Sequence, residues 1–256
     1  MLVIEGLQVE VGGRMLLKRI DLEIKPGETH ILFGPNGSGK TSLLMAIMGF
    51  PNYMVRGGHI YFMGREITGL PIHERARLGL GMSFQRPPTM HGLKTRQIVE
   101  LCARGKVDAA SLARRINMEH LLEREVNAGL SGGEIKRSEL LQLMAQDPDL
   151  LLFDEPESGV DLENIALVGK TVAWMLQKDV EPAQGEPPPL RESRRQRTKM
   201  GLIITHTGHI LNYLEADRGH VLFDGQLCCL GNPREILGCI GRFGYEECLR
   251  CLTATG

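Results

Sequence analysis

Apolar and polar positions alternate along the first 30 residues, and the pattern changes to longer periods after them. The segment begins with the apolar residues Leu2-Val3-Ile4, and it alternates clearly at Leu22-Glu23-Ile24, before a turn at Pro26-Gly27. Period-two alternation that ends in a turn predicts antiparallel strands. The apolar run at 29–33 predicts a buried strand, and the positions from 40 to about 48 predict a helix.

The rest of the chain divides into a polar helical stretch and a second half in which strands and helices alternate. Residues 58–63 predict another strand, and residues 86–127 show helical apolar spacing in a polar sequence, which predicts a small helical subdomain. The pattern then predicts a helix from 133, a strand at 150–153, a helix across 162–178, a strand at 202–205 and a hairpin near 220–230. Strands that alternate with helices indicate an α/β fold, with a mostly parallel sheet covered on both faces.

Residues 179–200 interrupt this second half. They contain four prolines and the basic run at 194–197, a composition that continues neither a helix nor a strand. We therefore predict a flexible surface insertion. Two interpretations stay open: a solvated linker without a function of its own, which is the usual role of a charge run, and a docking segment that uses its arginines.

Composition narrows the class of protein. A chain of 256 residues suffices for one large α/β domain with an inserted subdomain. Its net charge of -1 gives no basic field that would favour nucleic acid as a partner. The sequence has no apolar run near the roughly 20 residues that cross a bilayer, and its first residues do not resemble a signal peptide. We therefore expect a cytoplasmic protein without direct membrane insertion, whose six cysteines are thiols.

The segment between the first buried strand and the first helix carries a phosphate-loop pattern. Residues 34–41 read Gly-Pro-Asn-Gly-Ser-Gly-Lys-Thr, in the strand-loop-helix context that the pattern requires. Its glycines let backbone N–H groups wrap phosphates, assisted by the positive end of the helix. We expect Lys40 to reach the β- and γ-phosphates of ATP and the Thr41 hydroxyl to bind Mg²⁺. The expected phosphate contacts are Gly34, Pro35, Asn36, Gly37, Ser38, Gly39, Lys40, Thr41 and Ser42.

Polar residues follow two other apolar runs, where open α/β sheets bind ligands, and Gln85 comes just after a strand-like segment. After the run at 150–153, Asp154 is expected to hold Mg²⁺ and Glu155 to polarise the attacking water as general base. Gln85 is expected to bind Mg²⁺ or water and to link the core to the helical subdomain. His206 is expected to donate a hydrogen bond to the γ-phosphate. The plainer alternatives are an acidic pair that caps a helix and a structural histidine.

The segment at 130–134, Leu-Ser-Gly-Gly-Glu, is the most specific feature of the chain, and we call it the signature segment. Ser131 falls at the N-cap of a predicted helix, where backbone N–H groups bind anions. The phosphate loop already fills the anion site of its own chain. We therefore expect Ser131, Gly132 and Gly133 to contact the γ-phosphate of ATP bound to a second copy, in an ATP-dependent homodimer.

The order of these motifs resembles that of the ABC-type ATPases over about residues 1–235. Residues 158–161, Ser-Gly-Val-Asp, are similar to the D-loop of that family, which implies that Asp161 crosses the dimer interface. The resemblance implies one ABC ATPase domain over the whole chain, with ATP and Mg²⁺ as its ligands. The implied nucleotide-binding core is 1–85 and 129–256, and the implied helical subdomain is 86–128.

Within this superfamily the sequence resembles SufC, the ATPase of SUF iron–sulfur cluster assembly. The residues that carry the resemblance are 130–142, in which Lys136-Arg137 and Glu139 follow the signature segment; transporter ATPases more often have a Gln-x-Gln-Arg pattern there. Further similar segments are 52–58, 157–161 and 205–222. The resemblance implies a SufB/SufD-type β-helix scaffold as the partner, which two copies of the chain would move as they close on ATP.

Some residues depart from that family. Pro156 follows Glu155, as in many transporter ATPases, and Ile135 replaces a usually basic residue. Aromatic residues, which commonly stack on the adenine in transporter ATPases, are missing from 10–14, and Val11 is the expected substitute. The ATP-binding subunit of an ABC membrane transporter therefore stays open as the alternative function.

Five of the six cysteines crowd the C-terminal region, at Cys228, Cys229, Cys239, Cys248 and Cys251. The last two have the spacing of metal ligands, which suits a metal, sulfur or cluster contact. One such pair without a second pair or a histidine is a weak zinc signal. We favour the alternative of small buried hydrophobic residues and exposed thiols.

Overall fold

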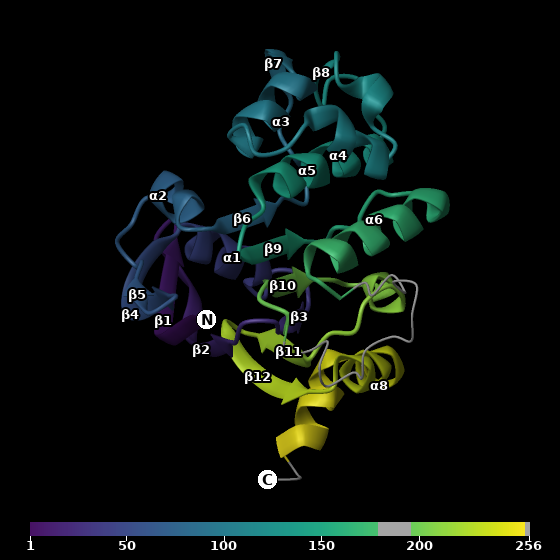
Figure 1. Ribbon diagram of the computed structural model, residues 1–256. Helices are drawn as coiled ribbons and strands as arrows, with labels where there is room; N and C mark the ends of the chain where they lie inside the picture. Colours follow the sequence, from purple (N-terminus) through teal and green to yellow (C-terminus); the bar gives the residue numbers. More distant parts are fainter. Residues whose placement is uncertain (179–195, 254–256) are drawn as a thin grey trace.

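One large sheet runs through the protein (Figure 1). The structure is a computed structural model that describes the backbone of residues 1–178 and 196–253. In order across the sheet, the strands within these residues are β5 (Arg65–Glu66), β4 (Met54–Phe62), β1 (Leu2–Val11), β2 (Arg14–Ile24), β12 (Gln226–Gly231), β11 (Arg218–Phe223), β3 (Thr29–Phe33), β10 (Met200–Ile204), β9 (Leu150–Asp154) and β6 (Leu80–Ser83). The predicted α/β fold class is confirmed.

Hydrogen bonding divides the sheet into a parallel and an antiparallel part. β11, β3, β10, β9 and β6 pair in parallel, whereas β1 pairs antiparallel with both β2 and β4. Every residue of β3, β9 and β10 is buried, as expected for parallel strands covered on both faces. The alternation in the first 30 residues therefore corresponds to an antiparallel subdomain, which joins the parallel part where β2 meets β12.

Helices cover both faces of the parallel part (Figure 1). Alternate residues of one strand enter two separate hydrophobic clusters: Ile31 and Phe33 join one, and Leu32 joins the other. The first cluster includes apolar residues of α5 and α6, and the second includes those of α1. The helices are α1 (Lys40–Met48), α2 (Ile72–Arg77), α3 (Thr95–Ala103), α4 (Ala109–Arg115), α5 (Gly132–Gln146), α6 (Leu162–Met175) and α8 (Pro233–Thr253), which is kinked at Gly244.

The segment predicted as helical, 86–127, contains a small sheet as well as α3 and α4. β7 (Met90–Lys94) and β8 (Glu125–Val126) pair antiparallel. Glu125 fixes this pairing, because its Oε1 accepts the Gly92 N–H at 2.9 Å. Contacts between residues so far apart in the chain leave no periodic signal in either segment, so the sequence pattern did not predict them.

The predicted insertion at 179–200 falls mostly outside the described residues, since 179–195 are not among them. Its last residues are part of the fold. The Thr198 N–H donates to Gln177 Oε1 at 2.7 Å, and Met200 is the first residue of β10. Within the described residues, all helices are too short or too polar to cross a bilayer.

Candidate nucleotide site

Sheet order brings four of the predicted motifs to one edge. β3, β10, β9 and β6 are consecutive parallel neighbours, so their carboxyl ends face the same side. The phosphate loop follows β3, His206 follows β10, Asp154 and Glu155 stand at the end of β9, and Gln85 follows β6. The phosphate loop and His206, which lie more than 160 positions apart in the chain, are therefore neighbours in space.

The phosphate loop is a tight turn built on glycine conformations. Gly37 and Gly39 have φ values of 80° and 104°, in the left-handed region that L side chains rarely adopt. Lys40 opens α1 and is 6% exposed; its Nζ donates to the carbonyl oxygens of Gly34 and Pro35 at 2.8 and 2.9 Å. Burial lowers the pKa of Lys40. A phosphate is a stronger partner for this ammonium than two carbonyls, so the loop suits an anionic ligand.

Thr41 and Asp154, two of the residues predicted to bind Mg²⁺, are in contact. The Thr41 hydroxyl donates to Asp154 Oδ2 at 2.9 Å. The other carboxylate oxygen, Asp154 Oδ1, is buried without a hydrogen-bond partner among the described residues. Burial, more than any neighbouring charge, raises the pKa of Asp154. A buried carboxylate oxygen without a partner beside a hydroxyl is a donor set that fits Mg²⁺, so these residues suit the expected ion.

The three residues predicted to act in hydrolysis meet at one carboxylate. Glu155 Oε2 accepts from Gln85 Nε2 at 2.8 Å, and Glu155 Oε1 lies 2.7 Å from His206 Nε2. The Glu155 backbone has a φ of 49°, and its N–H donates to Ile204 O at 3.1 Å. A non-glycine residue in this conformation is strained, and such strain concentrates at functional sites. The structure therefore brings these three residues together, and their roles in hydrolysis stay predictions.

Glu157 supports His206 and was not assigned a role from the sequence. It is 7% exposed, and its Oε1 accepts from the hydroxyls of Thr205 and, at 3.1 Å, Thr207. These threonines flank His206 on both sides. The local sequence carries no signal for this contact, because the loops that hold Glu157 and the two threonines come side by side only in the folded chain.

The signature segment opens α5 as predicted. Ser131 is the N-cap and forms a capping box with Glu134: the Ser131 N–H donates to Glu134 Oε2 at 2.7 Å, and the Glu134 N–H donates to Ser131 Oγ at 3.4 Å. Glycine is needed at 132 and 133 for close packing as well as for access by a phosphate. A Cβ on Gly132 would lie 2.3 Å from Gly159 O, and one on Gly133 would lie 3.1 Å from the Asn164 side chain.

The remaining predicted contacts lie at strand or helix ends. Asp161 is the N-cap of α6, and its Oδ1 accepts the Asn164 N–H at 2.9 Å. Val11 ends β1, where it packs partly buried against the cluster that includes α1. Ser42 is buried in the first turn of α1.

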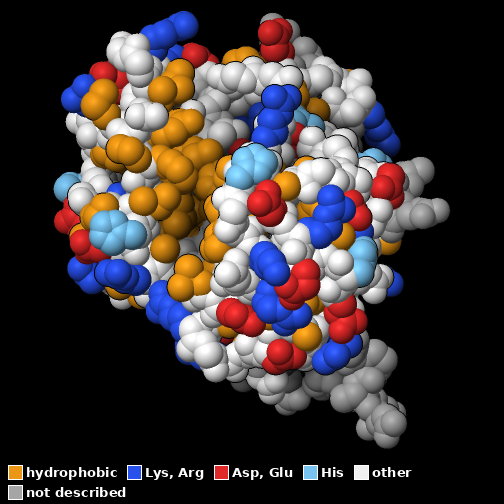
Figure 2. All heavy atoms as spheres, turned by 90° about the horizontal axis from the view of Figure 1, so that it is seen from above, with side chains coloured by type: hydrophobic (Ala, Val, Ile, Leu, Met, Phe, Trp, Pro, Cys, Tyr) orange, Lys and Arg blue, Asp and Glu red, His pale blue; other side chains and the backbone are white. Residues whose placement is uncertain are grey.

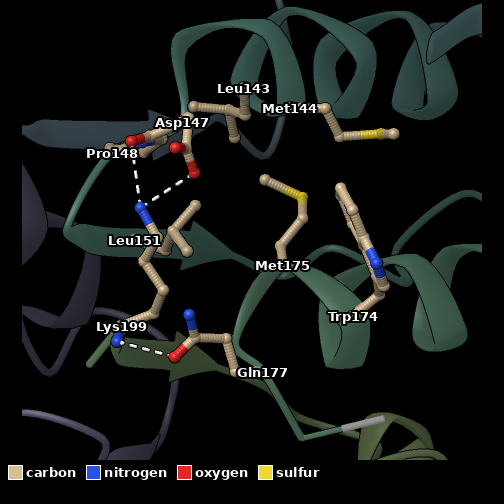
Figure 3. A pocket seen from close by; sticks show the side chains of 9 residues that line it. All are labelled: Leu143, Met144, Asp147, Pro148, Leu151, Trp174, Met175, Gln177 and Lys199. Atoms are coloured by element: carbon tan, nitrogen blue, oxygen red, sulfur yellow. Dashed lines mark hydrogen bonds and ion pairs between the residues drawn. The ribbon is translucent and has the colours of Figure 1, made fainter. Parts of the chain in front are cut away.

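A separate cavity of about 260 Å³ lies between α5 and α6, and the predicted site residues do not line it (Figure 3). Trp174 and Met175 line it, and Lys199 forms an ion pair with Asp147 there at 2.8 Å. The cysteines form no centre either: within the described residues, three or more His, Cys, Asp or Glu side chains nowhere gather in a way that suits a metal ion. The side chains of Cys248 and Cys251 lie outside the described part.

The family model described as ABC transporter matches residues 17–158, from β2 through the phosphate loop and signature segment to the D-loop. The chain belongs to the ABC ATPase family. This ABC ATPase is 36% identical over 245 residues to a probable ABC transporter ATP-binding protein of Streptococcus pyogenes, a match that covers 90% of this chain and 88% of the relative. It is 35% identical over 259 residues to vegetative protein 296 of Bacillus subtilis, with 96% and 92% covered.

Solved structures agree with the fold. An ATP-binding cassette of an ABC transporter superposes with a TM-score of 0.73 at 21% identity, over 97% of this chain and 98% of the other. A dimeric ATP-binding cassette in a post-hydrolysis state bound to ADP and phosphate superposes with a TM-score of 0.71 at 20% identity, over 91% and 99%. Family and fold together establish that the chain is an ATP-binding ATPase subunit.

Proposed function

We propose that this ABC ATPase closes as a homodimer on two MgATP molecules and uses hydrolysis to move a SufB/SufD-type scaffold for iron–sulfur cluster assembly in the cytoplasm. The observation that carries the proposal is the placement of Lys136 and Glu139. These residues belong to the segment by which the sequence resembles SufC. Both are buried against Ser83 and Phe84, the residues that lead into Gln85.

In the proposed reaction the phosphate loop holds the β- and γ-phosphates, with Lys40 turned from its loop carbonyls toward them. Thr41, Asp154 and Gln85 would hold Mg²⁺, which neutralises phosphate charge when bound. Glu155 accepts a proton from the attacking water, and Gln85 and His206 hold its carboxylate in place. Val11 lies beside the adenine.

The second copy completes the site. Its Ser131, Gly132 and Gly133 would approach the γ-phosphate with the N-terminus of α5, and its Asp161 would lie at the interface. Because each chain then supplies only part of either site, the proposal requires hydrolysis to depend on dimerisation.

An apolar groove beside the site is the proposed docking surface for the scaffold. It has a volume of about 660 Å³ and is lined by Phe50, Tyr53, Leu70 and Ile72, among others. Hydrophobic side chains gather in a hollow on the face shown in Figure 2. Phe50 makes an edge-to-face contact with Phe84, with ring centroids 5.9 Å apart. A partner that fills the groove would therefore press on the residue next to Gln85.

The second candidate function is the ATP-binding subunit of an ABC membrane transporter. Two observations favour it: the name of the S. pyogenes relative, and Pro156 after Glu155. A membrane permease would use the same groove, so the fold of this chain is compatible with both partners.

Purification of the tagged chain from its native cells, with mass spectrometry of the bound subunits, tests the two proposals. A bound β-helical protein without apolar spans of about 20 residues supports the scaffold. A bound permease with several such spans refutes it and supports the transporter. Phe50→Asp serves as the control, because a charge in the groove should release either partner while ATP binding is retained.

A further inference from the structure

Three hydrogen bonds connect the two residues before Gln85, Ser83 and Phe84, to helix α5. Glu139 Oε1 accepts the Phe84 N–H at 2.6 Å, and Glu139 Oε2 accepts the Ser83 hydroxyl at 2.6 Å. Lys136 Nζ donates to Phe84 O at 2.5 Å. Both backbone polar groups of Phe84 are therefore bound by side chains from α5.

These contacts are costly to build. Lys136 is 3% and Glu139 6% exposed, and the burial of charged side chains is unfavourable unless they are hydrogen-bonded and paired. The two residues are three positions apart and so share one face of α5. Burial raises the pKa of Glu139 to about 7. Both contacts survive a change of its protonation state, because a protonated Oε2 donates to Ser83 Oγ where a charged one accepts.

The same helix connects two parts of the nucleotide site. Its first residue, Gly132, follows the N-cap Ser131, which is proposed to face the nucleotide of the second copy. One to two turns later, side chains of α5 bind the backbone of Phe84. The side chain of the next residue, Gln85, donates from Nε2 to Glu155 Oε2 at 2.8 Å. One helix and three hydrogen bonds thus connect the segment proposed to contact the nucleotide of the second copy with Gln85, which belongs to the nucleotide site of its own chain.

We propose that Glu139 and Lys136 are positioning residues that hold the Phe84 backbone, so that Gln85 is aimed at Glu155 and moves together with the start of α5. The proposal rests on the role proposed for Gln85 and applies to either partner. It differs from a purely structural role. Contacts that only stabilise the fold change the melting temperature but leave the turnover of the folded enzyme unaltered.

Steady-state ATP hydrolysis without a partner tests this proposal. Glu139→Ala should lower kcat on the order of ten- to a hundredfold, because small displacements of an aligned catalytic group cost this much. The KM for ATP should change by less than about threefold, since the phosphate loop is untouched. Glu139→Gln should restore most of kcat, because its amide oxygen accepts the Phe84 N–H and its NH₂ group donates to Ser83 Oγ.

A double-mutant cycle shows whether Glu139 acts through Gln85. Gln85→Ala should itself lower kcat, and Glu139→Ala should cause no further loss in the Gln85→Ala background. The matched control is Gln146→Ala, which removes another contact from α5 to the same strand: Gln146 Nε2 donates to Leu80 O at 2.9 Å, at the end of β6 away from Gln85. This control should keep the wild-type kcat.

Several outcomes would overturn the proposal. They are an unchanged kcat in folded Glu139→Ala, an equal loss of kcat with and without Gln85, or an equal loss in the Gln146→Ala control. If Glu139→Ala does not fold, Lys136→Met tests the other half of the grip and should show the same fall in kcat. An unchanged kcat for Gln85→Ala would refute the role of Gln85 itself, a result that does not depend on the partner.

Discussion

The substitution Asp154→Asn should make the nucleotide-free protein more stable while it removes the response to Mg²⁺. In the wild type, Asp154 is 1% exposed, and its Oδ1 has no hydrogen-bond partner among the described residues. Burial raises the pKa of Asp154, so folding disfavours the charged form of this carboxyl group. The contribution of Asp154 to the free energy of unfolding is therefore fully present below the pKa of this group in the unfolded state. It is lost as the pH rises through the pKa of the group in the folded state.

The magnitude follows from the contacts. Asparagine has nearly the same shape and can still accept from the Thr41 hydroxyl, so the substitution mainly removes a buried charge that its neighbours compensate only in part. That change should raise the free energy of unfolding by about 1–2 kcal/mol. In a chain of this size the melting temperature should then rise by roughly 2–8 °C. The loss of attraction between Asp154 and Lys40 keeps the gain at the lower end.

Thermal unfolding with and without MgATP provides the assay. At a ligand concentration of about a hundred times Kd, the wild type should gain about 2.7 kcal/mol. The variant should gain no more with MgATP than with ATP and EDTA. The control is Asp224→Asn, which breaks the exposed ion pair to Lys18 and should change stability by less than about 0.5 kcal/mol. A lower melting temperature for nucleotide-free Asp154→Asn, or an intact Mg²⁺-dependent gain, would refute the reasoning.

Four other outcomes are expected. Lys40→Ala should abolish or severely weaken ATP binding in calorimetry, since the loop loses its charge. Glu155→Gln should bind ATP, lose hydrolysis by about a hundredfold or more, and elute as a dimer with ATP in gel filtration; normal hydrolysis would exclude it as the base. Gly132→Ala should unfold more easily, by on the order of 1–3 kcal/mol, since its Cβ would meet Gly159 O at 2.3 Å. The pKa of Glu139 is raised to about 7. Between pH 5 and 8 the wild type should therefore lose on the order of 1–3 kcal/mol of unfolding free energy relative to Glu139→Gln. Denaturant titrations measure this difference, and parallel pH curves for the two proteins would contradict it.

The sequence alone predicted the parts of the protein that depend on local order. The phosphate loop is recognisable because a strand, a glycine turn, Lys40 and a helix must follow one another directly. The N-cap position of Ser131 is equally local. The apolar runs before Asp154 and His206 placed these residues at strand ends, because every position of a parallel strand is buried.

Tertiary structure decided which of these residues meet. Strand order set β10 between β3 and β9 and so brought His206 to Glu155. The approach of Gly159 to Gly132 and the hydrogen bonds between Glu139 and Phe84 join residues at least 25 positions apart. The left-handed backbone of Glu155 depends on the residues packed around it. Hydrophobic periodicity reports only which face of an element is buried. It does not report which residues pack against that face, and the buried charged contacts of this ATPase are formed with those residues.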